Sequence, residues 1–280
     1  MSFKIYGDDN PISWSIFQSC ANQLIEKNKT QRSKTPLYYS DWVFRGQSQQ
    51  SWMLATSLER YIKNELNLED KKFYLEEYYR AAHSVLPAVN SLTGNNFPDI
   101  EDIDEKDFSK FGYFKQPSFH YFLRHNGFPS PLMDWSYSYY VAAFFAFSAA
   151  TNSDDVSIYA YREYCGESKS GIVGRPIIET QGPYIETHHR HFSQQSTYTV
   201  CYASEVKNGE RKVYFAKHED AVLTESSSDH MIKFILSKNE KDKVLESLYY
   251  MNINDYSLFR TDESLLKSEA FLNFKLGGRR

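Results

Sequence analysis

The longest apolar run of the chain covers residues 139–150, where Ser148 is the polar interruption. A helix that is apolar on every side is buried on every side. The run therefore predicts a central helix enclosed by the rest of the fold. It is too short to cross a bilayer, which takes about 20 apolar residues, so we expect a core helix of a soluble protein.

A helix and a turn are predicted just before this run. Pro117 suits the first position of a helix, and Gly127 suits the left-handed position just after one. The two prolines of residues 128–131 then exclude helix, because each disfavours the α region in the residue before it. Asp134 stands where its carboxylate can cap the apolar helix. The alternative is that Asp134 and His125 form the floor of a pocket.

Further elements follow from hydrophobic periodicity along the chain. Strands are predicted at residues 3–6, 42–44, 156–161, 197–202 and 212–216. Helices are predicted at residues 14–25, 70–89, 231–236, 240–250 and 263–274, with Ser13, Asp229 and Asp262 capping the first, third and fifth. Loops are predicted at residues 26–36, 90–110 and 165–191. Such a mixture without regular βαβ alternation predicts an α+β fold, with a short mixed or antiparallel sheet around the buried helix.

Length and composition agree with a globular protein. The 280 residues can form one large domain, and 41% hydrophobic and 24% charged residues are ordinary proportions. We expect residues 1–40 to form an N-terminal strand and helix, residues 41–220 the main domain, and residues 221–280 a C-terminal helical part packed on it.

Charge and cysteine content narrow the class of protein. The net charge of −4 excludes a global basic field that attracts nucleic acid, although it leaves room for a local basic groove. Three cysteines without C-x-x-C spacing indicate a reducing compartment without disulfides. The first ten residues lack a basic-then-apolar signal pattern. We therefore expect a cytoplasmic protein without a membrane partner.

Motif searches exclude several kinds of site. Residues 188–191 (HHRH) form a histidine cluster, but no second cluster at ligand spacing accompanies it, so no metal is expected. The glycine-rich fingerprints of Rossmann and P-loop proteins and the G-x-S-x-G of α/β-hydrolases are absent from the sequence.

Arg45 is the strongest single candidate for binding chemistry. It stands at the end of a predicted short strand and precedes Gly46, which permits a close backbone approach. A fixed guanidinium in that place is a planar, bidentate partner for phosphate or carboxylate. The alternative is a structural ion pair with an acid such as Asp134 or Glu59.

Three segments resemble, in the same order, the motifs of the FRG domain family. The first is FRGQ at residues 44–47, followed by Trp52, Leu54, Ser57, Leu58 and Arg60. The second is HNGFPSPLMDWS at residues 125–136, and the third is RHFSQQSTYT at residues 190–199. The chain departs from the family pattern with Arg124 for Gln, Pro131 for Arg and Ser196 for Gly. The resemblance implies an FRG domain within residues 41–220.

A more distant resemblance is to arginine-type ADP-ribosyltransferases. A strand-borne Arg-Gly after an aromatic residue, here Phe44 to Gly46, is similar to the motif whose Arg grips the phosphates of NAD. Residues 143–146 (AFFA) are similar to their central aromatic-alanine segment. Those enzymes also carry a Glu that stabilises a ribosyl cation. Here Gln194 and Gln195 stand in that region, and an amide cannot carry the negative charge.

Together these resemblances imply a fold similar to that of ADP-ribosyltransferases, with NAD as the cofactor. The implied catalytic residues are Arg45, His125, Asp134 and Gln194. The implied cofactor contacts are Arg45, Gly46, Gln47, His125, Trp135 and Arg190. Arg45 would bind the diphosphate, His125 the ribose or base, and Gln194 would orient the ligand or nucleophile, while Asp134 and Trp135 would shape the pocket.

The implied activity is nucleotide binding, with ADP-ribosyl transfer or NAD cleavage by a toxin or phage-defence effector acting on an unknown protein or nucleic-acid target. Two alternatives stay open. In one, the same residues lock the fold of a non-catalytic protein-interaction domain. In the other, a local groove binds nucleic acid, as in a nuclease-like protein.

Overall fold

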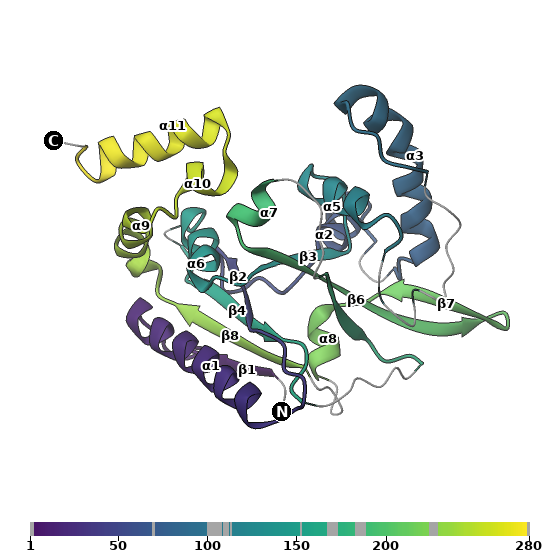
Figure 1. Cartoon of the computed structure of the whole chain (residues 1–280), viewed down its shortest axis with the longest axis horizontal. Coiled ribbons are helices and arrows are strands. Elements are labelled where there is room, and N and C mark those ends of the chain that lie inside the picture. Colours follow the sequence, from purple (N-terminus) through teal and green to yellow (C-terminus); the bar gives the residue numbers. More distant parts are fainter. Residues whose placement is uncertain are drawn as a thin grey trace.

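A mixed sheet of eight strands organises the computed structural model (Figure 1). The structure describes residues 3–68, 71–99, 108, 112, 114–151, 153–166, 173–182, 189–223 and 229–278. The strands are β1 (Phe3–Tyr6), β2 (Val43–Gln47), β3 (Leu132–Ser136), β4 (Val156–Arg162), β5 (Ile177–Gln181), β6 (Ser196–Lys207), β7 (Glu210–Phe215) and β8 (His230–Leu236). Their order is β1-β8-β4-β2-β3-β6-β5, with β7 also paired to β6. β1 and β8 are parallel, and the other pairs are antiparallel.

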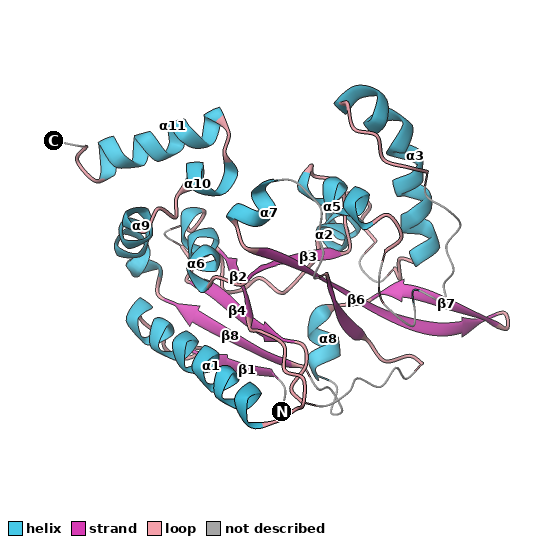
Figure 2. Ribbon diagram, in the orientation of Figure 1, coloured by secondary structure: helices cyan, strands magenta, loops and turns pink. Residues whose placement is uncertain are grey.

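Helices cover both faces of this sheet (Figure 2). They are α1 (Trp14–Lys34), α2 (Ser57–Asn64), α3 (Leu75–Thr93), α5 (Pro117–His125), α6 (Tyr139–Ser148), α7 (His189–Ser193), α8 (His218–Leu223), α9 (Lys241–Tyr250), α10 (Asp255–Phe259) and α11 (Asp262–Ala270). Phe44 and Ile158 pack into one core with α1, α6 and α9. Their strand neighbours Val43 and Tyr159 pack with α8. Because successive strand residues face opposite sides, α8 lies on the opposite face.

Helix α6 is the central helix that its apolar sequence predicts. Ala143, Ala146 and Phe147 are completely buried. The helix lies on β2 so closely that a Cβ atom built on Gly46 would be 1.9 Å from the Ala142 carbonyl oxygen. The small residue thus brings helix backbone against strand backbone, and this contact fixes the position of Arg45 next to it.

Other predictions are also confirmed, with shifted bounds. The α+β class holds, as do the strands that became β1, β2, β4, β6 and β7 and the helices that became α3, α5, α9 and α11. Ser13 caps α1 through its side-chain oxygen. Gly127 has the predicted left-handed backbone, with φ 86°. No helix in the described ranges is long and apolar enough to cross a membrane.

The helix predicted at residues 231–236 is wrong, because this segment is strand β8. It pairs with β4 from His230–Arg162 to Leu236–Val156. Both faces of β8 are covered, so residues 231–236 are apolar except for Lys233, and the pattern alone does not distinguish the segment from a short buried helix. Asp229, the expected cap, lies just before the strand and is buried.

Four further predictions need correction. Thr261, not Asp262, caps α11, and Asp262 is the first residue of that helix. The expected loop 26–36 belongs largely to α1, which continues to Lys34 and carries basic residues in its last turn, where the helix dipole favours them. The expected loop 165–191 contains β5. Asp134 is not a helix cap: it lies in β3, and Ser138 caps α6. Of the predicted loop 90–110, residues 90–93 end α3, while 100–107 and 109–110 lie outside the described residues.

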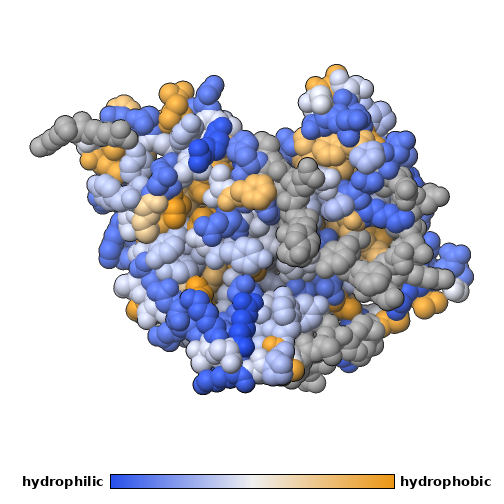
Figure 3. All heavy atoms as spheres, viewed as in Figure 1, coloured by the Kyte–Doolittle hydropathy of each residue, from blue (hydrophilic) through white to orange (hydrophobic). Residues whose placement is uncertain are grey.

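Apolar side chains reach the surface over the C-terminal helices. In the space-filling view one group of them lies at the upper left, over α11, and another lies at the upper right, over α3 (Figure 3). Leu266 is 69% exposed and Phe274 is 91% exposed.

Candidate functional site

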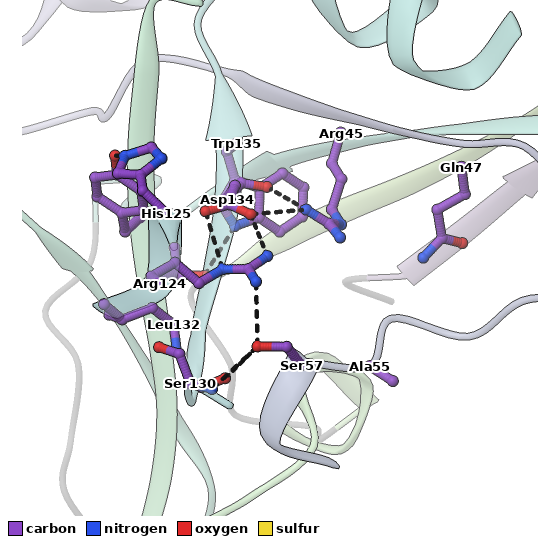
Figure 4. A network of polar contacts seen from close by, with 12 residues as sticks. Arg45, Gln47, Ala55, Ser57, Arg124, His125, Ser130, Leu132, Asp134 and Trp135 are labelled. Atoms are coloured by element: carbon purple, nitrogen blue, oxygen red, sulfur yellow. Dashed lines mark hydrogen bonds and ion pairs between the residues drawn. The ribbon is translucent and has the colours of Figure 1, made fainter. Parts of the chain in front are cut away.

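The sheet splits between its two central strands. All five residues of β2 pair with β4, and all five residues of β3 pair with β6. Between β2 and β3, however, the ladder contains one pair, Phe44–Ser136. Beyond it the Arg45 side chain reaches across, and its Nη1 donates to the backbone carbonyl oxygen of Asp134 at 2.8 Å (Figure 4). A guanidinium therefore replaces the ladder hydrogen bonds where the two strands separate.

A cleft of about 1490 Å³ lies at this split. Its wall is formed by β2, the segment that follows β2, α2, the end of α5, and β3, with further residues from Pro176 to Phe259. Arg45, His125, Asp134 and Gln194 all line it, as do Gly46, Gln47, Trp135 and Arg190. The three motifs, far apart in sequence, therefore meet at one cleft. Its volume exceeds that of most small-molecule pockets, about 300–1,000 Å³.

Asp134 is held mainly by Arg124, which comes from the end of α5. Arg124 Nε donates to Oδ1 at 3.2 Å, and its Nη2 donates to Oδ2. Its Nη1 donates to Ser57 Oγ at 3.1 Å, which ties α5 and β3 to the start of α2. Burial raises the pKa of the Asp134 carboxyl, but the charges of Arg124 and Arg45 outweigh it and hold the pKa below the usual value. Asp134 is therefore ionised at neutral pH.

Arg45 is a buried cation with few protein acceptors. Its side chain is 17% exposed, and Nη1 lies 3.8 Å from Asp134 Oδ2, so the predicted ion pair with Asp134 exists but is long. Its Nε has no hydrogen-bond partner among the described residues. Burial, with smaller contributions from Arg124 and Arg60, lowers the pKa of Arg45 to about 10 against the attraction of Asp134. The guanidinium thus stays charged at neutral pH, with donors to spare.

Glu59, the other acid expected to pair with Arg45, is engaged at the start of α2. Its Oε2 accepts from the backbone N of Thr56 at 2.7 Å, and Thr56 Oγ1 accepts from the backbone N of Glu59 at 3.1 Å. This reciprocal pair is a capping box. Burial raises the pKa of Glu59 above its usual value, against the hydrogen bonds from Thr56.

Positive charge dominates the lining of the cleft. Eight Lys or Arg side chains line it against four carboxylates, in a chain whose net charge is −4. Arg60, on α2, donates to the carbonyl oxygen of Ala55 at 2.5 Å. Burial and the nearby charge of Arg124 lower the pKa of Arg60. Three guanidiniums, those of Arg45, Arg60 and Arg124, therefore surround the single carboxylate of Asp134, and this arrangement favours an anion.

His125 reaches the cleft beside these arginines. Its Nε2 lies 2.7 Å from the hydroxyl of Tyr198, which also lies 3.1 Å from His191 Nδ1. Burial lowers the pKa of His191, and burial together with Asp134 raises that of Tyr198. One phenol therefore joins two imidazoles from different helices and fixes the orientation of the His125 ring.

Trp135 and Gln47 use their polar groups inside the protein. Trp135 is 2% exposed, and its Nε1 donates to Thr199 Oγ1 at 2.8 Å. The Nε2 of Gln47 donates to the carbonyl oxygen of Met53 at 3.1 Å, while its Oε1 has no partner in the described part of the chain. Both residues thus shape the wall of the cleft.

Gln194 and Arg190 connect the cleft to the C-terminal helices. The Nε2 of Gln194 donates to the carbonyl oxygen of Leu258 at 3.2 Å, and Arg190 Nε donates to that of Phe259 at 3.3 Å. His188 lies outside the described residues, and no group of three or more potential metal ligands occurs within them.

Sequence reasoning missed several residues of the cleft. Arg124 was noted only as a departure from the family motif, and Lys217 and Glu219 belong to none of the three motifs. One signal was present: Thr56-Ser-Leu-Glu59 is a capping-box sequence. It predicts α2, which carries Arg60 into the cleft.

Comparison with known proteins identifies the region that carries most of this site. Residues 40–155 match the family model of the FRG domain. No curated protein and no solved structure matches the chain. The matched segment supplies the cleft residues from Phe44 to Ala149, and those from Pro176 to Phe259 follow it. The chain therefore contains an FRG domain, which covers residues 40–155.

Proposed function

We propose that the cleft binds the diphosphate of a nucleotide such as NAD or ADP-ribose. The observation that carries the proposal is the grouping of Arg45, Arg60 and Arg124 around the single carboxylate of Asp134. A diphosphate supplies the missing negative charge, and its oxygens match the planar fork of arginine.

The roles of the three arginines differ in this proposal. Arg124 donates its hydrogen bonds to Asp134 and Ser57, so it positions these residues and is not a proposed phosphate contact. Among the described residues, Arg45 donates to one backbone carbonyl through Nη1, and Arg60 likewise has one backbone acceptor. Arg45 and Arg60 are therefore the proposed phosphate contacts. His125, oriented by the Tyr198 hydroxyl, is the proposed contact to a ribose hydroxyl.

The resemblance to ADP-ribosyltransferases extends the proposal to ADP-ribosyl transfer or NAD cleavage, in a toxin or defence effector. Such chemistry uses a carboxylate to stabilise a ribosyl cation. Both oxygens of Asp134 are bound by Arg124, and the Gln194 amide contacts Leu258. Glu219 also lines the cleft, and its Oε1 accepts from Leu54 N at 3.1 Å, while Oε2 meets no donor among the described residues. Glu219 is the proposed carboxylate that would stabilise the ribosyl cation in this reaction.

Isothermal titration with NAD, ADP-ribose and inorganic pyrophosphate tests the binding proposal. Arg45→Ala and Arg60→Ala should each weaken nucleotide affinity by about 1.5–3 kcal/mol, the scale of a charge-assisted hydrogen bond. Arg45→Lys should restore part of it, because a point charge lacks the bidentate fork. Arg80→Ala, which removes an exposed arginine paired with Glu76 on α3, is the matched control.

Nicotinamide release measured by chromatography tests the catalytic extension, with Glu219→Gln as the inactive variant. Absence of heat and of thermal shift for wild-type protein at millimolar nucleotide and pyrophosphate would contradict nucleotide binding. The interaction-domain alternative would then stand.

A further inference from the structure

Trp52 and Met53 expose large apolar side chains within the cationic cleft. Trp52 is 49% exposed and Met53 is 62% exposed, and both line the cleft. The other three tryptophans of the chain are at most 6% exposed. Exposed apolar surface inside a concave polar site indicates a place that a ligand covers.

The backbone under these two side chains is held by three separate elements. Gln47 of β2 donates through Nε2 to the Met53 carbonyl oxygen at 3.1 Å. Tyr159 of β4 donates through its hydroxyl to the Trp52 carbonyl oxygen at 3.3 Å. Glu219 of α8 accepts from Leu54 N at 3.1 Å, and the Leu54 side chain is buried. The segment is therefore rigid, although its first two side chains face outward.

The Trp52 ring has no structural partner of its own. Among the described residues, no aromatic stacking, cation–π contact or side-chain hydrogen bond involves it, in a protein that contains dozens of aromatic contacts. The hydrogen bond of Trp52 to Tyr159 is made by its backbone carbonyl oxygen. The backbone beneath the ring is held by hydrogen bonds and the ring is half exposed, so a ligand that covers it buries apolar surface on a fixed segment.

We propose that Trp52, with Met53 beside it, is the surface on which a heteroaromatic ring of the bound ligand stacks. The inference rests on the proposed function and adds to it the ring end of the ligand, the adenine that NAD and ADP-ribose share. The shared cleft supplies the argument for this occupant: cations for the phosphates and a flat apolar ring for the base are the two features that nucleotide recognition combines.

The test compares ligands with and without a ring. Trp52→Ala should weaken ADP-ribose and NAD roughly 5- to 150-fold, the range that corresponds to base–aromatic stacking. It should change pyrophosphate affinity less than about 2-fold, because stacking does not involve phosphate. Trp52→Phe should lie between the two proteins. Tyr250→Ala, which removes an exposed aromatic side chain that does not line the cleft, is the control and should bind like wild type.

Acrylamide quenching of tryptophan fluorescence gives a second readout, because Trp52 is the exposed tryptophan and a neutral quencher does not compete for the cations. ADP-ribose should protect Trp52 from quenching, and pyrophosphate should not. Unchanged ADP-ribose affinity in Trp52→Ala, while pyrophosphate still binds, would overturn the stacking surface and leave the diphosphate site intact. Equal losses for both ligands would also overturn it. Protection that rises with protein concentration alone would instead show that a second copy covers the ring. Binding of neither ligand to wild type would remove both proposals.

Discussion

Arg124 occupies both carboxylate oxygens of Asp134. Arg45 therefore meets Asp134 chiefly at its backbone carbonyl, at 2.8 Å, and lies 3.8 Å from the carboxylate. The carboxylate thus organises the arginines around it without neutralising them all. This relationship predicts how the cleft responds to loss of that charge.

Asp134→Asn should lower the free energy of unfolding by about 1–3 kcal/mol at neutral pH, because it removes the carboxylate that Arg124 binds and that Arg45 faces. The pKa of Asp134 is lowered in the folded protein, so its stabilisation is present above the unfolded pKa of about 3.9 and is lost as pH falls further. Urea denaturation of both proteins at a series of pH values measures the effect. The difference should shrink in acid.

Asp41→Asn is the control for this effect. It removes a 58% exposed carboxylate that pairs with Arg32 at 2.7 Å, and such exposed pairs contribute at most about 1 kcal/mol. Equal losses in the two variants would show that the arginine group adds nothing beyond a surface ion pair.

His120 should make the protein sensitive to moderate acid. It is completely buried, its Nδ1 lies 3.3 Å from the Tyr78 hydroxyl, and burial lowers its pKa to about 3. Between about pH 6.5 and pH 3 the unfolded chain binds a proton that the folded protein excludes. Stability therefore falls as pH falls, by up to about 1.4 kcal/mol per pH unit. Urea midpoints of wild type and His120→Phe should diverge below pH 6.5, with the variant less acid-sensitive. Parallel pH profiles would refute this role.

Two variants separate the capping hydrogen bonds of α2 from the charge of Glu59. Thr56→Ala removes the oxygen that accepts from Glu59 N and should cost about 0.5–2 kcal/mol. Glu59→Gln keeps an acceptor for Thr56 N but removes the buried charge. The folded-state pKa of Glu59 is raised, so the carboxyl favours folding below its unfolded pKa and loses that contribution as pH rises. Glu59→Gln should equal or exceed wild-type stability at pH 7.5. Thermal unfolding at pH 7.5 and 4.5 measures both variants, and a large loss at pH 7.5 would contradict the assignment.

Gly46→Ala should be among the most damaging small changes. The new methyl group would lie 1.9 Å from the Ala142 carbonyl oxygen, which is helix backbone that cannot move aside by itself. We expect a loss of about 3 kcal/mol or more, at the upper end of overpacking costs. Gly94→Ala is the matched comparison, because its Cβ meets nothing within 4 Å and the cost is the left-handed backbone alone, about 1–2 kcal/mol. Chemical denaturation should rank the two clearly, and a milder effect at Gly46 would mean that α6 can lift from β2.

The elements with strong local signals were predictable from sequence. The apolar composition of α6 and the Pro117 and Gly127 boundaries of α5 are properties of single segments. β3 and β8 were not predictable in the same way. Residues 132–136 are too few to show a period, and residues 231–236 are apolar except for Lys233, so pairing with distant strands decides their structure.

In the candidate site, too, the sequence predicted which residues line the cleft but not how their side chains pair. The three motifs predicted that Arg45, His125, Asp134 and Gln194 share a cleft, which they line together. The partners of each side chain were not visible, because Arg124 and Asp134 lie on different elements and meet only after β3 pairs with β6. Relative to the family pattern, the chain gains an arginine at position 124 and lacks one at position 131. The gained guanidinium is the one that holds Asp134.

The tripeptide Phe44-Arg45-Gly46 gives three consecutive residues three different neighbours. Phe44 is buried in the core with α6, Arg45 faces the split of the sheet, and Gly46 lies under the helix backbone. Altering any one of them disturbs the folding of β2 and, with it, the proposed ligand contact of Arg45. Variation in the proposed ligand preference is therefore more accessible at Trp52, Met53 and Arg60, which line the cleft outside β2. A selection for altered specificity should accumulate its substitutions there and leave β2 unchanged.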